Sequence, residues 1–180
     1  MKNPATAPVA GAILFALIAS ITVLAQSPSK PSEPSPLTQI SWLTGGTWVA
    51  EIKGEQGVIT TRIENRIRWS ENGQLIKFIT TFISHNKPEV HYEGIYAWDP
   101  AKKQISFWYT DNDGNLTQGT AAMAGETLTQ DFDIAHAGGR VDKLRSLIVR
   151  DSPDSYQWNV SAPKEGKWAE LLHLHYTREK

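Results

Sequence analysis

Hydrophobic and polar residues alternate in short runs along most of this 180-residue chain, and each run ends at a turn signal. A period of two is typical of a β-strand with one buried face and one solvated face. Turn signals such as Glu71-Asn72-Gly73 and Asp99-Pro100 separate the runs. The pattern predicts ten strands, at residues 47–53, 58–70, 75–84, 90–98, 105–110, 116–123, 127–134, 143–150, 156–160 and 168–177.

The connections between these runs are nearly all two to six residues long. Such connections join antiparallel neighbours and leave no room for the crossover helices of a parallel sheet. An open sheet of this size would have two unpaired edges, which closure removes. The predicted fold is therefore all-β: one antiparallel meander closed into a barrel of roughly ten strands, with a short helical turn at 37–43 before the first strand. A two-sheet sandwich is the alternative, but the chain lacks the longer crossovers that it needs.

The N-terminal region predicts export. Residues Val9 to Ala25 are apolar apart from Ser20 and Thr22, and Lys2 precedes them. Small residues before Gln26 fit a cleavage site, so residues 1–25 are interpreted as a signal peptide and the protein as secreted or periplasmic. Cleavage would leave no membrane span, whereas an uncleaved anchor is the alternative because the run nears the lower length limit of a spanning helix.

Residues 26–36, rich in Pro and Ser, are interpreted as a flexible tether, and residues 37–180 as the folded domain. The chain has no cysteine, so the domain must be stabilised by burial, for which seven Trp, five Tyr and five Phe supply apolar area. The formal net charge is −1 and no basic block occurs, which gives nucleic-acid binding no support.

Two short motifs resemble the calycin superfamily, which includes lipocalins, fatty-acid-binding proteins and nitrobindin-like barrels. Gly46-Thr47-Trp48 opens the first predicted strand, and Arg178 closes the last one. The domain is also similar to secreted bacterial calycin-like domains of unknown function. The resemblance implies that Trp48 plugs one end of the barrel and that Arg178 packs on its face. Fatty-acid-binding proteins carry a helical lid after the first strand; only Glu55-Gln56-Gly57 stands there, which suggests an open mouth.

Strand parity then predicts the interior of the barrel. If Arg178 points inward, so do Tyr176, Glu170 and Trp168, because alternate side chains share a face. An inward carboxylate costs free energy unless it is paired or hydrated, so Glu170 is a candidate ligand contact, with a salt bridge at the barrel mouth as the alternative.

The strand at 58–70 has a charged face and an apolar face. Arg62, Glu64, Arg66 and Arg68 share the first; Ile59, Thr61, Ile63, Asn65, Ile67 and Trp69 share the second. The simple interpretation places the charges in water. The alternative makes the charged face the interior, with an arginine that binds a carboxylate ligand. Together these patterns nominate Glu64, Arg66, Glu170 and Tyr176 as candidate ligand-binding residues.

No cofactor is predicted. His173 and His175 share one strand face and are the only weak metal candidates, because no third ligand has a fixed spacing. The nitrobindin-like resemblance leaves a haem held by one histidine open.

Three functions are consistent with this sequence. The leading hypothesis is a non-catalytic exported barrel that binds a small apolar or amphipathic molecule. The second is a hydrolase or isomerase that uses an interior Glu64 or Glu170 as general base. The third is an extracytoplasmic interaction module that uses an outer barrel face.

Overall fold

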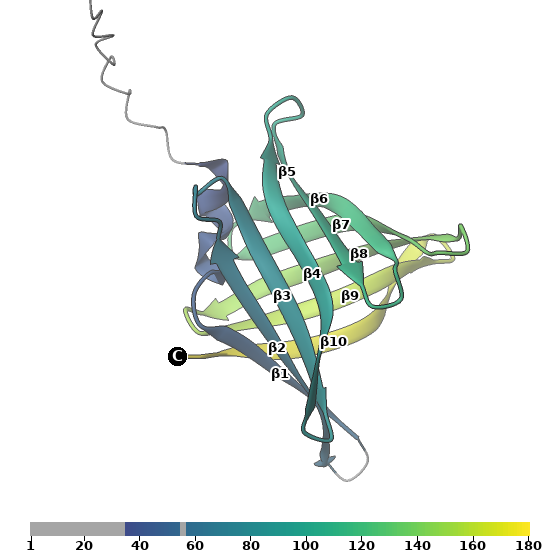
Figure 1. Ribbon diagram of the computed structural model, residues 1–180. Helices are drawn as coiled ribbons and strands as arrows, with labels where there is room; N and C mark the ends of the chain where they lie inside the picture. The colour runs from purple at the N-terminus through teal and green to yellow at the C-terminus, as the bar shows by residue number, and fades with distance from the viewer. Residues whose placement is uncertain (1–34, 55–56) are drawn as a thin grey trace, which may run out of the picture. The chain divides into compact units, whose positions relative to one another are not determined.

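The structure, a computed structural model, describes residues 35–54 and 57–180. The predicted signal peptide and all of the predicted tether except Ser35 and Pro36 lie outside these residues. A 3-10 helix, η1 (Pro36–Leu43), precedes ten strands (Figure 1). The strands are β1 (Thr47–Lys53), β2 (Ile59–Trp69), β3 (Leu75–Ser84), β4 (Lys87–Asp99), β5 (Gln104–Asp111), β6 (Leu116–Ala124), β7 (Thr127–Ala135), β8 (Val141–Ser152), β9 (Ser155–Lys164) and β10 (Lys167–Glu179).

Each strand pairs antiparallel with the next, and β10 pairs with β1, so the sheet closes into a ten-stranded barrel. This confirms the predicted meander. Several strands run further than predicted because their turns are tighter. His85 and Asn86, at φ 52° and 59°, form the whole turn between β3 and β4. Positive φ at both central residues suits a two-residue hairpin, so Lys87 and Pro88 already belong to β4.

The helix η1 packs apolar side chains into one end of the barrel. Leu37, Ile40 and Leu43 are all buried, and Pro36 begins the helix. Trp48, at the start of β1, is fully buried beside them, and its indole Nε1 donates a hydrogen bond to the Leu43 carbonyl at 2.7 Å. The helix and this indole therefore close the end at which β1 begins. No helix among residues 35–54 and 57–180 is long and apolar enough to cross a membrane.

Arg178 completes this closure. Its Cζ lies 4.2 Å from the centroid of the Trp48 ring, and the two residues are register partners on β10 and β1. The guanidinium donates hydrogen bonds to the carbonyls of Trp42 (2.6 Å), Thr44 (2.9 Å) and Gly45 (2.9 Å). Arg178 thus ties the end of η1 to the last strand, and the predicted Trp–Arg pair is confirmed.

Two glycines, Gly94 on β4 and Gly119 on β6, let aromatic rings approach the backbone from inside. A Cβ at Gly119 would lie 2.5 Å from the Phe132 Cβ, and one at Gly94 would lie 2.5 Å from the Phe78 Cζ. Neither distance is compatible with a real side chain, so glycine is needed at both positions. The rings that use this space line the interior described next.

Candidate functional site

A cavity of about 110 Å³ lies inside the barrel, and one of its lining residues, Tyr156, contacts Trp48 with ring centroids 4.7 Å apart. Eight of its twelve lining residues are aromatic, and three of the other four carry a hydroxyl or an amide. The five tyrosines of the chain all belong to the interior: four line the cavity, and Tyr176 packs beside it. The interior is thus apolar in its bulk, with a few polar groups that can orient a ligand.

The aromatic rings form one connected wall. The centroids of Tyr92 and Tyr109 lie 5.3 Å apart in an edge-to-face arrangement, and those of Phe78 and Tyr96 lie 5.4 Å apart. Contacts of this geometry stabilise a core by more than the burial of their apolar area alone would. They also restrict each ring, so the cavity is formed before any ligand arrives.

A buried hydrogen-bond chain crosses the cavity wall. The Ser146 hydroxyl donates to the Gln130 side-chain oxygen at 2.5 Å, and the Gln130 amide donates to the Tyr96 hydroxyl at 2.9 Å. Because the Tyr96 oxygen accepts a bond, its own proton is available to donate. The chain therefore fixes the direction of the Tyr96 hydroxyl at the cavity.

Asn65 supplies a hydrogen-bond acceptor, whereas Tyr96 supplies a donor. The Asn65 side-chain oxygen is buried at the cavity wall and accepts no hydrogen bond from the described residues, whereas a hydrogen bond from the Asn65 side chain lowers the pKa of Tyr156 against the larger effect of burial. An unsatisfied buried acceptor costs about 1–3 kcal/mol, and native proteins keep few of them. Asn65 and Tyr96 thus offer one acceptor and one donor to the same small space.

Burial keeps the tyrosines protonated. Desolvation raises the pKa of Tyr109 to about 12, against a smaller lowering from a hydrogen bond with Thr117. Desolvation likewise raises the pKa of Tyr96, Tyr156 and Tyr176. At neutral pH these groups are therefore hydrogen-bond donors and not bases.

The two ends of the barrel differ. Opposite the η1 end, exposed aliphatic side chains stand at or just before the starts of β2, β6 and β8; they are Val58, Ile59, Leu116 and Val141. The Gly54 N–H donates to the Val58 carbonyl at 2.9 Å, which closes a tight connection between β1 and β2. Three residues separate Gly54 from Val58 in the sequence, which is too few for a helical lid.

The inward direction predicted for Glu170 and Trp168 is wrong. The register of β9 and β10 shifts between Glu170 and Leu172, and this bulge reverses the alternation of β10. Tyr176 is buried, stacked 4.8 Å from Tyr156, whereas Glu170 and Trp168 are exposed on the outer face. Only the part of β10 that follows the bulge keeps the predicted parity.

The alternative in which the charged face of β2 lines the interior is also wrong. Ile63 and Ile67 are buried in the core. Glu64 lies on the outer face, in ion pairs with Arg62 (3.1 Å) and Arg66 (2.9 Å). Neither Glu64 nor Glu170 lines the cavity, so neither is placed to act there as a general base.

His173 and His175 lie on the outer face of β10. The His173 Nε2 contacts the Gln157 side-chain oxygen at 2.8 Å, and the His175 Nε2 lies 3.7 Å from an Asp151 carboxylate oxygen. Among residues 35–54 and 57–180, no three His, Cys, Asp or Glu side chains are grouped to hold a metal ion. The cavity is also small and none of its lining residues is a histidine, so these residues do not fit a haem held by one histidine.

The sequence interpretation missed the polar groups of the cavity. Asn65 was a detectable signal, because it stands alone as an amide on the Ile63–Ile67 face of β2. Gln130 gave the same kind of signal on the apolar face that Leu128 and Phe132 form on β7, whereas Tyr96 follows the ordinary alternation of its strand.

Comparisons with known proteins inform the fold. No protein-family model and no curated protein matches this chain. The crystal structure of Rv2717c from M. tuberculosis superposes with a TM-score of 0.54 and 12% identity, over 82% of this chain and 100% of that one. A structure of EF1p2_mFAP2b bound to DFHBI matches with a TM-score of 0.32 and 15% identity, over 78% of this chain and 97% of that one, which is too low to carry an argument. The comparisons support a barrel fold and give no function.

Proposed function

We propose that this protein is an exported, calycin-like barrel that binds a small amphipathic molecule in its interior without catalysis. The observation that carries the proposal is the buried Asn65 oxygen at the cavity wall, which accepts no hydrogen bond from the described residues. A ligand with one donor group would satisfy it, and the Tyr96 hydroxyl would bind an acceptor on the same ligand. The aromatic wall suits the rest of a flat, apolar body.

The size of the cavity narrows the ligand class. Drug-sized ligands occupy sites of roughly 300–1,000 Å³, whereas a dry cavity of about 150 Å³ holds benzene. The present cavity, at about 110 Å³, matches a single-ring molecule. A fatty acid or a larger lipid would require the aromatic wall to rearrange. The exposed aliphatic side chains at the far end of the barrel suit the passage of such an apolar molecule.

Phenol is the simplest probe, because it combines one aromatic ring with one hydroxyl. We expect saturable phenol binding by calorimetry and nuclear magnetic resonance shifts confined to residues at the cavity. Asn65→Leu should abolish this binding and raise the free energy of unfolding, because it removes an unsatisfied acceptor and fills space. Absence of phenol binding, together with native mass spectra that show no co-purifying compound, would refute the proposal.

The chain offers a matched control for that variant. Asn159, on β9, also has a buried side-chain oxygen without a hydrogen-bond partner among the described residues, but it does not line the cavity. Asn159→Leu should leave phenol affinity unchanged. Equal losses in the two variants would show that the effect reports stability and not contact with the ligand.

Export rests on the apolar run of residues 9–25. Expression of the full chain in a bacterium and mass analysis of the periplasmic product should yield a protein that begins at Gln26. A product that retains residues 1–25 in the membrane fraction would favour the anchor instead.

A further inference from the structure

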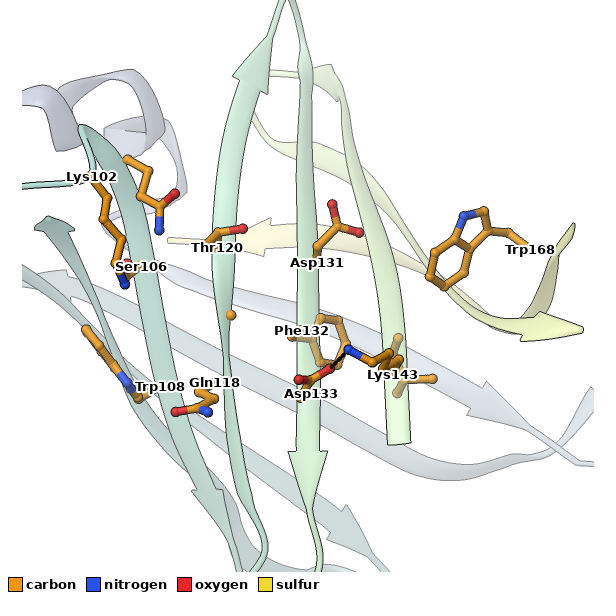
Figure 2. A pocket seen from close by; sticks show the side chains of 13 residues that line it. Lys102, Ser106, Trp108, Gln118, Thr120, Asp131, Phe132, Asp133, Lys143 and Trp168 are labelled. Atoms are coloured by element: carbon orange, nitrogen blue, oxygen red, sulfur yellow. Dashed lines mark ion pairs between the residues drawn. The ribbon is translucent and has the colours of Figure 1, made fainter. Parts of the chain in front are cut away.

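A second hollow, of about 520 Å³, lies on the outer face of strands β5–β8 (Figure 2). Its floor follows the register across the sheet, where Ser106, Thr120 and Asp131 are successive partners, and Arg145 on β8 is the next partner beyond the floor. Their side chains point away from the interior, because the neighbours of these residues along each strand belong to the core. The sheet therefore lies between this outer groove and the interior cavity, and Phe132 borders both.

Two exposed indoles flank the groove. Trp108 on β5 is 39% exposed and Trp168 on β10 is 45% exposed, and Figure 2 shows them on opposite sides of the hollow. The other tryptophans of the described residues are buried or half-buried. Burying an indole against a ligand is strongly favourable, so two exposed rings beside one hollow indicate a binding surface.

The Trp168 indole is held in place. The Arg145 guanidinium lies 4.8 Å from its ring centroid. Two hydrogen bonds, of 2.7 and 3.0 Å, fix this guanidinium on the Asp131 carboxylate. A ring positioned in advance loses little conformational entropy when a ligand binds. The β-bulge in β10 is what turns Trp168 to this outer face.

The charges that line the groove are compensated by one another or by near neighbours. Asp131 pairs with Arg145, Asp133 pairs with Lys143 at 3.4 Å, and Lys102 lies 3.7 Å from an Asp99 carboxylate oxygen. A charged ligand would therefore find no uncompensated partner. The groups left for a ligand are uncharged: the amides of Gln104 and Gln118 and the hydroxyls of Ser106 and Thr120.

Exposed flat rings combined with neutral hydrogen-bonding groups suit one class of ligand. A sugar ring presents a face of C–H groups that packs on an indole, and a rim of hydroxyls that pairs with amides and hydroxyls. An extended peptide commonly adds to a free sheet edge, and the closed barrel offers none. We infer that the outer groove binds a neutral oligosaccharide, with Trp108 and Trp168 as the two stacking platforms.

Titration of the full protein with cellohexaose, maltohexaose and chitohexaose, followed by tryptophan fluorescence and calorimetry, tests this inference. At least one of these neutral oligosaccharides should bind saturably, and an anionic oligogalacturonate should not. Trp108→Ala and Trp168→Ala should each weaken binding about tenfold, which corresponds to about 1.4 kcal/mol. Trp168→Phe keeps a ring and should recover most of the affinity, which separates stacking from a general effect on folding.

Val90→Ala is the matched control, because Val90 is exposed on β4 and does not line the groove. The affinity of the Val90→Ala variant for the oligosaccharide should equal that of the unaltered protein. The inference is overturned if no neutral probe binds at about 10 mM, the weak end of measurable affinities. It is also overturned if both tryptophan variants bind as the unaltered protein does. Phenol binding in the cavity is measured separately, so either site can fail without the other.

Discussion

Replacement of Arg178 by methionine tests the physical basis of the barrel closure. Methionine retains most of the apolar length of the side chain but removes the guanidinium. That group donates to the carbonyls of Trp42, Thr44 and Gly45 and covers the Trp48 ring. The change therefore isolates the polar and cation–π contributions from simple packing.

The magnitude follows from these contacts. The cation–π contact contributes about 0.5–2 kcal/mol, and a hydrogen bond to a charged group contributes about 1.5–3 kcal/mol. The contributions are not additive, and the Arg178 side chain is 16% exposed, so we expect a loss of about 4 kcal/mol in the free energy of unfolding. Because a domain of this size is stable by about 5–15 kcal/mol, the loss is a large fraction of the total.

Urea denaturation followed by tryptophan fluorescence and far-ultraviolet circular dichroism measures this loss. Arg66→Met is the matched control, because Arg66 is 65% exposed and, within residues 35–54 and 57–180, pairs only with Glu64; this variant should change stability by about 0–1 kcal/mol. The loss of stability in Arg178→Lys should fall between those of Arg178→Met and Arg66→Met, since lysine keeps the charge but lacks the planar guanidinium. Equal midpoints for Arg178→Met and Arg66→Met would show that the closure does not depend on the guanidinium.

Three further outcomes follow from the interior. Gly119→Ala should lower stability by about 1–3 kcal/mol in thermal melts, because the added Cβ overlaps Phe132, whereas Gly138→Ala, with open space around it, should not. Ser146→Ala should cost about 1–3 kcal/mol in urea, because it leaves the buried Gln130 oxygen without its donor; no shift in midpoint would exclude this role. Burial raises the pKa of Tyr109 from 10.0 to about 12, so the stability that protonated Tyr109 contributes is complete below pH 10 and is lost as pH rises through 12. Tyrosinate absorbance should therefore rise together with the loss of circular dichroism, and ionisation of Tyr109 while the fold persists would contradict this.

Much of the fold could be predicted because its signals are local. Alternation, turn residues and short connections predict each hairpin independently of the others, and closure follows from the need to pair both edges. The pairing of Trp48 with Arg178 was expected from the resemblance to calycins and not from a local signal, and the pairing of β1 with β10 brings the two residues together.

The site could not be predicted in the same way, because the register of a strand decides which face of the sheet each side chain occupies. One extra residue in β10, between Glu170 and Leu172, reverses every side chain before it. No pattern in residues 167–172 marks this bulge, so parity counted back from Arg178 assigned Glu170 and Trp168 to the wrong face. In β2, which pairs without a bulge from Arg62 to Trp69, the simpler interpretation of parity is confirmed.

Strand β7 shows how one short segment serves both proposed sites. Gln130 lines the interior cavity, Asp131 and Asp133 line the outer groove, and Phe132 borders both. Alternation accounts for this division, since a pleated strand turns successive side chains to opposite faces. The strict alternation keeps the charged pairs of the groove out of the apolar interior, where an ion would be costly. A barrel wall made of a single sheet can therefore present a polar surface outside and line an aromatic cavity inside.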